Sequence, residues 1–424
     1  MSATLPKSGD SPLNPGAQPK VRKKRRWLRW LAAVATIMVL LIFFLPSIIA
    51  LPIFRQRVLD SVASRLNAKA TVGQLSLAWF SPLKAGDFKL QPEECDRAAL
   101  LISRMEGDRS LVRLLFGNNL GNYRFVEPEL YVEFDREGTN IGRLLRALAG
   151  AALLNRPAGA QIENGRLVLR GKNSPQPWTA DKLNIKCDFI PAVQSQSGVS
   201  ELHGRQTQLW HEMELTPDLC NELLQFVIPI LARTTRVSGK ISLELDDFNW
   251  PLGKSSATEL KGRLTLHSVE AGAGELTKSI AELVAPGIAD GAVEIAKDDV
   301  VAFSMQNGRV YHENLAFSLA GIHAISHGSV GLDESLDWFV DVQIPALEAM
   351  DAAAHPILSA LSQQRPTLHF TGTLEKYDWS IEGMSLASFR TLLDALRGRV
   401  DGHSQGTRPR LLPGRSGGGT QSGS

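Results

Sequence analysis

The stretch VEPELYVEFDREGTN, residues 126–140, shows the pattern that decides the fold. Leu130, Val132 and Phe134 alternate with polar or charged neighbours, so apolar side chains fall on one side of the chain. Successive side chains of a β-strand point to opposite faces, so this period of two is typical of a strand with one buried face. The same period recurs between about residues 70 and 370, which predicts about 16 to 20 short strands, mostly antiparallel.

The recurring runs supply a set of apolar side chains that we expect to line one continuous face. A sheet with one apolar face must bury it, and the sequence predicts few helices to cover it. The runs therefore either pack on each other as a closed sandwich or form an open trough. The predicted lining residues are Leu75, Leu77, Trp79, Phe88, Leu90, Leu130, Val132, Phe134, Leu167, Leu169, Ile185, Phe189, Ile241, Leu243, Leu245, Leu264, Leu266, Phe317, Val340, Val342 and Phe370.

Two Asn-Gly pairs indicate tight turns. Asn164-Gly165 and Asn307-Gly308 each lie between alternating runs, and Asn-Gly is the strongest short hairpin signal because both central residues need positive φ. The two segments, IENGRLVL and MQNGRVYH, look alike and are consistent with a weak repeat.

Short helices are expected between the strands. Thr216 as N-cap with Pro217 at the first helical position supports one of them. Just after the anchor described below, apolar residues recur at helical spacing: Phe54, Val58, Leu59, Val62 and Leu66. This helix either lies on the membrane surface or caps the end of the sheet, and the cap is favoured. Including the one that Thr216 supports, the helices expected between the strands are 108–116, 141–154, 217–232, 274–285, 346–362 and 385–397.

A basic cluster from Lys20 to Arg29 runs into an uncharged apolar stretch from Trp30 to Leu51. Roughly 22 residues at about 1.5 Å each can cross a hydrocarbon core about 30 Å thick. The basic side stays in the cytoplasm, which predicts that the rest of the chain lies across the membrane. A cleavable signal peptide is the alternative, but its apolar core spans about 7 to 15 residues, and Ile48 stands where a small residue would precede cleavage.

The chain therefore divides into four parts. Residues 1–29 form a disordered basic cytoplasmic tail, 30–51 a transmembrane anchor, 52–401 an extracytoplasmic body, and 402–424 a Gly/Ser-rich disordered end. The formal net charge of +2 arises from the basic ends, and the body itself is acidic. An acidic body argues against nucleic-acid binding, which needs a basic face to neutralise phosphates.

Residues with catalytic or metal-binding chemistry form no recognisable constellation. Gly253–Ser255 lacks the earlier glycine of a phosphate loop. His323 and His327 are four apart on a strand-like run, about 13 Å by strand geometry and too far to share a metal. The spacing of the three cysteines, Cys95, Cys187 and Cys220, fits no zinc site. One disulfide between two of them is possible in an oxidising compartment. We expect no catalytic residue, no metal and no cofactor.

The stretch at 126–140 resembles a segment of the AsmA-like family of bacterial envelope proteins. The matching residues are Pro128, Leu130, Val132, Asp135, Gly138 and Asn140. The order of anchor, helix and first strands is also similar, as is the later stretch from Phe303 to Trp338. The resemblance covers about residues 70 to 400, more closely at both ends than between 171 and 235.

This resemblance implies a mainly β fold in which an elongated, curved antiparallel sheet forms an open groove with an apolar inner face. It implies a protein of the inner membrane whose periplasmic body, residues 52–401, carries phospholipid acyl chains for outer-membrane maintenance, as chorein-type bridge proteins do. About 16 to 20 strands spaced about 4.8 Å apart give a groove of about 75 to 95 Å, short for a complete bridge, so a partner protein, self-association or shuttling would be needed.

Two other functions stay open. An exposed sheet edge can pair with client strands, which would make the chain an assembly factor for envelope proteins. An anchored hydrolase with a scattered active site is the third alternative.

Overall fold

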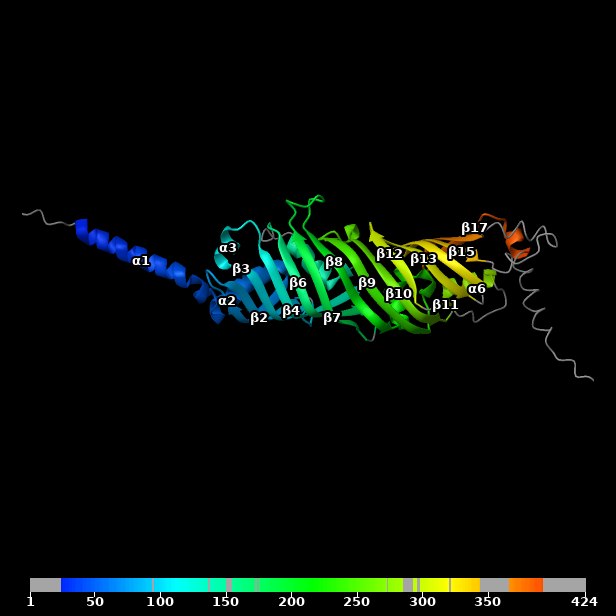
Figure 1. The fold of residues 1–424 in the computed structure, drawn as a ribbon, viewed down its shortest axis with the longest axis horizontal. Helices are drawn as coiled ribbons and strands as arrows, with labels where there is room; N and C mark the ends of the chain where they lie inside the picture. Colours follow the sequence, from blue (N-terminus) through cyan, green and yellow to red (C-terminus); the bar gives the residue numbers. More distant parts are fainter. Residues whose placement is uncertain are drawn as a thin grey trace, which may run out of the picture.

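One β-sheet dominates the molecule (Figure 1). The structure is a computed structural model, and it describes residues 24–93, 95–135, 138–149, 155–171, 174, 176–272, 274–284, 293–295, 298–319, 322–343 and 366–391. Within these residues seventeen strands form a single sheet. The described strands therefore make no second, facing sheet of a closed sandwich, and the predicted mainly β class is confirmed.

The strands follow one another along the chain. They are β1 (Ala68–Ser76), β2 (Pro82–Pro92), β3 (Leu100–Ser110), β4 (Gly121–Asp135), β5 (Gly138–Thr139), β6 (Ala158–Gly171), β7 (Trp178–Ile190), β8 (Glu201–Glu214), β9 (Val237–Pro251), β10 (Glu259–Ala271), β11 (Val293–Ile295), β12 (Asp299–Gln306), β13 (Arg309–Leu319), β14 (Ile322–Gly331), β15 (Ser335–Gln343), β16 (Thr367–Thr373) and β17 (Tyr377–Glu382).

Neighbouring strands are almost all antiparallel. The exception is the pair β4 and β6, which run parallel because the chain crosses back between them. Parallel neighbours need such a crossover, and here it includes the helix α4 (Asn140–Ala149). Within the described residues β1 pairs only with β2, and β17 only with β16. The sheet is thus an open meander with two edges.

A row of irregularities bends the strands. Most of the long strands contain an interior residue with positive φ, and register shifts accompany several of them. A bulge bends its strand and increases the local twist, so a repeated row of bulges curls the whole sheet. The residues concerned are Asp87, Glu127, Asn164, Lys182, Glu212, Gly239, Ser268, Asn314, Gly328 and Gly372.

One of the two predicted hairpins is wrong, because its Asn-Gly pair belongs to this row of bulges. Asn307 and Gly308 have φ of 52° and 72° and join β12 to β13, so that hairpin is confirmed. Asn164 also has positive φ, 53°, but the chain continues straight through it within β6. The prediction of a hairpin at Asn164-Gly165 is wrong, because the same left-handed conformation here forms a bulge.

The helices are short apart from the first. They are α1 (Lys24–Ile49), α2 (Pro52–Ala63), α3 (Leu111–Phe116), α4, α5 (Pro217–Glu222) and α6 (Glu275–Val284), with 3₁₀ turns at Ser64–Leu66, Leu224–Phe226, Pro229–Leu231 and Ser255–Ala257. The single helix expected over 217–232 is wrong, since α5 ends at Glu222 and Pro229 starts a separate turn. The Thr216 cap is confirmed by its acceptance of the Leu219 N–H.

Some predicted helical residues have no described structure. The helix expected at 346–362 lies outside the described residues, as do the second part of 385–397, the predicted tail 402–424 and residues 1–23 of the predicted tail 1–29. The prediction of disorder is wrong for residues 24–29, because α1 begins at Lys24. A helix is present over residues 386–391.

The first helix is long and apolar enough to cross a membrane over Arg29–Ile49, 21 residues. The next helix, α2, packs against β1, as the favoured alternative predicts. Leu59 on α2 and Leu66 just after it, both of the predicted apolar face, join the buried cluster at the first strands. Arg55 Nη1 donates to the Gly73 carbonyl at 2.9 Å and Gln56 Nε2 to the Ala70 carbonyl at 3.2 Å. Phe54 and Val58, of the same predicted face, are exposed.

The curl of the sheet can be tested at Gly328 in β14. Its φ is 138°, and an added Cβ would lie 2.4 Å from the Asp337 carbonyl oxygen. We expect Gly328→Ala to lower the stability of the full chain in detergent by about 2 kcal/mol or more, from backbone strain and the clash. Gly86→Ala is the control, because its Cβ would meet its nearest atom at 3.6 Å. Equal urea midpoints for the two variants would contradict this role.

Candidate functional site

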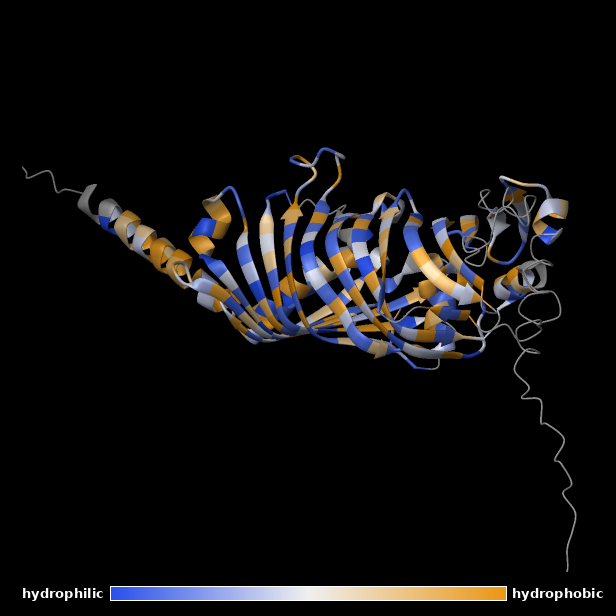
Figure 2. Cartoon of the chain, turned by 45° about the vertical axis from the view of Figure 1, so that its right-hand side comes forward, coloured by the Kyte–Doolittle hydropathy of each residue, from blue (hydrophilic) through white to orange (hydrophobic). Residues whose placement is uncertain are grey.

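The predicted lining residues share one face of the sheet. The register places Leu90 opposite Leu100, Leu100 opposite Leu130, and Leu130 beside Leu167. Similar links connect all later strands, so every lining residue that lies on a strand belongs to this inner face. Leu77 and Trp79 follow the end of β1. Figure 2 shows the sheet curled along its length, with strands of alternating hydropathy.

The C-terminal half of the inner face is filled by the chain itself. The segment around α5 and the following 3₁₀ turns contributes fully buried side chains, among them Leu219, Ile228 and Leu231. Helix α6 joins them, and its Thr277 hydroxyl donates to the Ile230 carbonyl at 3.0 Å. The lining residues that are buried in this core are Ile241, Leu264, Leu266, Phe317, Val340, Val342 and Phe370. They stabilise the fold and leave no open surface of their own.

The N-terminal half is covered less completely. A small cluster of Ala63, Leu66 and Leu144 covers Leu90, where α2, α4 and the first strands meet. The lining residues that remain only half-buried are Leu75, Leu77, Trp79, Phe88, Leu130, Val132, Phe134, Leu167, Leu169, Ile185, Phe189, Leu243 and Leu245. Among these, the residues that belong to neither cluster of buried residues in the described part of the chain are Leu75, Leu77, Trp79, Leu130, Val132 and Phe189. The accessible apolar surface of the inner face is therefore concentrated over β1 to β7.

Asn140 builds the turn from β4 into α4. Its Oδ1 accepts from the Glu133 N–H at 3.0 Å and the Ile141 N–H at 2.8 Å, while its Nδ2 donates to the Tyr131 carbonyl at 2.9 Å. The side chain is buried, so these bonds satisfy polar groups that would otherwise be costly. Asn140, a residue of the motif at 126–140, thus has a structural role in positioning α4.

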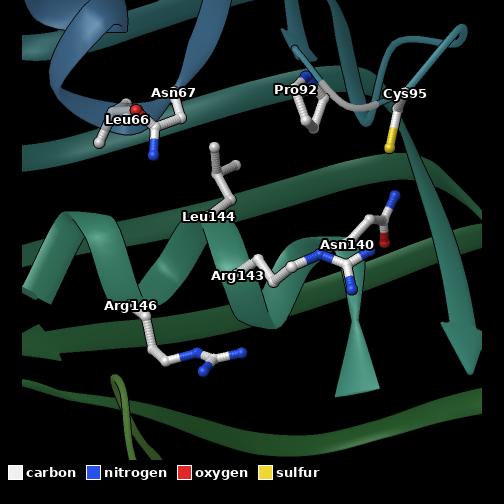
Figure 3. A pocket seen from close by; sticks show the side chains of 8 residues that line it. All are labelled: Leu66, Asn67, Pro92, Cys95, Asn140, Arg143, Leu144 and Arg146. Carbon is white, nitrogen blue, oxygen red and sulfur yellow. The ribbon is translucent and has the colours of Figure 1, made fainter. Parts of the chain in front are cut away.

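A hollow of about 440 Å³ lies beside this turn. Figure 3 shows Arg143 and Arg146 of α4 along it, with Leu66 and Leu144 close by. Guanidinium groups pair well with phosphate and carboxylate oxygens. The hollow therefore combines a basic wall with apolar side chains of the small cluster, which suits the junction between a phosphate group and a hydrocarbon chain.

The cysteines and histidines differ in burial. None of the three cysteines forms a disulfide, and burial raises the pKa of the Cys187 thiol to about 11 and of Cys220 to about 12. His323 and His327 are exposed on β14. Within the described residues no group of three His, Cys, Asp or Glu side chains has the placement to hold a metal ion.

His312 is a titratable side chain buried in the filled half. It lies on the inner face of β13 with its Nε2 3.3 Å from the Ser326 hydroxyl, and burial, with a smaller contribution from His327, lowers its pKa from 6.5 to about 4. The imidazole is therefore neutral at physiological pH. The cause is geometric: His312 is only 1% exposed, so its ring has little contact with water in the folded chain.

Comparison with known proteins gives no relative for this chain: neither a protein-family model nor a curated protein sequence matches it.

The dryness of the filled half predicts a pH-dependent stability. Because the folded-state pKa of His312 lies below its unfolded value, the unfolded chain binds the extra proton first as pH falls below about 6.5. This residue should cost the native protein about 2 kcal/mol between pH 7 and pH 5. His312→Leu should remove that loss in denaturant titrations at the two pH values, whereas the exposed control His323→Leu should keep it. An unchanged pH dependence in His312→Leu would show that water reaches this site.

Proposed function

We propose that this protein is held in the membrane by α1 and binds phospholipid acyl chains on the inner face of its sheet, over β1 to β7. The proposal rests on one observation: the apolar inner face of the sheet is continuous, but the chain's own side chains bury it much more completely in one half than in the other. Its C-terminal half is filled by α5, α6 and the turns between them, while side chains such as Leu130 and Val132 stay half-buried.

The energetics favour an apolar ligand there. Each methylene transferred from water to an apolar surface contributes about 0.8 kcal/mol. An acyl chain lying along several half-buried side chains of neighbouring strands would gain several times that amount. A long flexible chain suits such a surface better than a compact ligand, because the uncovered residues follow one another across strands.

The resemblance to AsmA-like envelope proteins supports the same function. On this proposal the basic residues before Trp30 stay in the cytoplasm, and the sheet lies in the periplasm against the inner membrane. The phospholipid then serves envelope maintenance, with no chemical reaction, and the head group stays at the polar rim. The basic hollow at Arg143 and Arg146 has the charge that a phosphate head group needs.

The filled half limits the mode of transfer. A lipid cannot slide along an inner face that the protein's own helices occupy. The protein therefore receives or holds a lipid near the anchor, and passing it further requires a partner protein, a second copy or displacement of the filling helices. A shuttle or a loading factor fits this arrangement better than a continuous bridge.

The proposal is tested by photo-crosslinking in membranes. Val132 is half-buried on the inner face of β4, and the next residue, Glu133, is exposed on the outer face. We expect a photoreactive phenylalanine at Val132, or at Leu130 on the same face, to form phospholipid adducts detectable by mass spectrometry. The same probe at Glu133 should give at least several-fold fewer. Absence of lipid at both inner positions, or equal adducts at all three, would overturn the proposal.

The open edge of the sheet favours a second candidate function, that of an assembly factor. Within the described residues β17 has a neighbour on one side only, and Trp379 on it is exposed. A strand with one free side offers main-chain groups to an incoming strand of a client protein.

This second function predicts protein adducts at the edge. A photoreactive residue at Asp378 in β17 should crosslink envelope proteins, whereas the same residue at Asp337, an exposed position in the interior strand β15, should not. Strand pairing requires a free edge, so equal protein adducts at the two positions would indicate unspecific contact. Lipid adducts at Val132 without protein adducts at Asp378 would leave lipid binding as the function.

A further inference from the structure

Large apolar side chains are exposed at the anchor end of the sheet. They come from three places: α2, the connection between β1 and β2, and α3. Phe80 is 80% exposed and Phe116 is 82% exposed, although aromatic side chains of this size are usually well covered. We name this group the insertion surface; it consists of Ile53, Phe54, Val58, Phe80, Leu115 and Phe116.

Hydrogen bonds tie part of this surface to α1. Trp79 Nε1 donates to the carbonyls of both Ile42 and Phe43, at 3.0 Å each. The N–H groups of Leu111 and Val112, at the start of α3, in turn donate to the carbonyls of Ala78 and Trp79 at 3.4 and 3.2 Å. The connection after β1 therefore lies against α1, and the start of α3 lies against that connection.

The position of the contact along α1 sets its depth. Ile42 and Phe43 precede the helix end at Ile49 by about one and a half to two turns, or roughly 10 Å along the axis. The apolar span Arg29–Ile49 has 21 residues, which is about the length needed to cross a hydrocarbon core of about 30 Å. Little of this span is left to emerge into water. Trp79 consequently lies at the depth of the acyl chains if α1 crosses the bilayer.

The charges around the surface suit a membrane. Arg57 on α2 and Arg113 on α3 are exposed, and each has a long apolar stem that lets its guanidinium reach the head groups. The acidic residue of α2, Asp60, accepts a hydrogen bond from Gln56 at 2.7 Å and lies one to two turns beyond Phe54. Basic residues near the surface are attracted by anionic lipids.

We propose that the insertion surface enters the membrane leaflet next to α1, so that the sheet stands embedded in the bilayer at its first strands instead of being tethered above it. The occupant of this surface is the lipid leaflet. The inference rests on α1 as a membrane-spanning helix and does not require that the inner face binds lipid. Embedding brings the half-buried side chains of β1 and β2 next to acyl chains of the same leaflet.

Site-directed fluorescence on the full chain in liposomes tests the proposal. Single cysteines replace Phe80 or Phe116 in a Cys95→Ser background, and the buried Cys187 and Cys220 are kept. Each is labelled with the environment-sensitive fluorophore NBD, after reconstitution into vesicles of phosphatidylethanolamine and phosphatidylglycerol. Val193→Cys is the matched control, because Val193 is also 80% exposed but lies between β7 and β8, away from the anchor.

Labels at Phe80 and Phe116 should emit at shorter wavelength than the label at Val193. Spin-labelled lipids in the vesicles should quench them, while a water-soluble quencher should act mainly on Val193. If the two labels behave like the control, the surface faces water, or faces a protein that purified vesicles lack, and the inference is wrong. Circular dichroism of each labelled variant shows that it is folded, and lipid adducts at Val132 are scored separately, so failure of lipid binding is distinguishable from failure of insertion.

Discussion

The whole structure depends on covering one apolar face of a single, open sheet. A flat sheet of this size would leave half of its side chains without cover, since no second sheet faces it within the described residues. The bulges at positions such as Asp87 and Asn314 relieve this constraint by bending each strand, so that the apolar face turns inward along its whole length. Curvature therefore provides what a second layer provides in a sandwich.

Curling alone does not bury the inner face, and the two halves of the molecule complete the burial differently. In the C-terminal half the chain inserts the segment from Leu215 to Ala232 and the helix α6, and the result is a dry core around Trp338. In the N-terminal half the described residues form a small separate cluster at Leu90 and Leu144, and the large core reaches as far as Trp178 and Leu183 of β7. The stable half can hold the sheet in shape while the other half keeps an apolar surface accessible, which is the division of tasks that a ligand-binding scaffold needs.

The sequence predicted the alternation, the number of strands and the shared face of the lining residues, because each follows from the local period of two. It could not predict which lining residues are buried. Leu130 and Val340 have the same pattern around them, and only the distant α5 and α6 decide that Val340 lies in the core. The two Asn-Gly pairs show the same limit: both adopt positive φ, but whether the chain reverses or bulges depends on how neighbouring strands continue to pair.

The helix α2 connects the covering of the sheet with the membrane. Its pattern predicted one apolar face against the protein, and Leu59 and Leu66 of that face do pack in the small cluster. Phe54 and Val58 are exposed, however, and Arg55 and Gln56 bond the carbonyls of β1. In water Phe54 and Val58 would stay exposed and would contribute no hydrophobic stabilisation. If α1 crosses a bilayer and this end inserts as proposed, acyl chains would cover them, and the bilayer would act as the missing layer at this end. The acyl chains that would cover Phe54 would then lie at the end of the sheet where the accessible part of the inner face begins, at Leu75 on the edge strand β1.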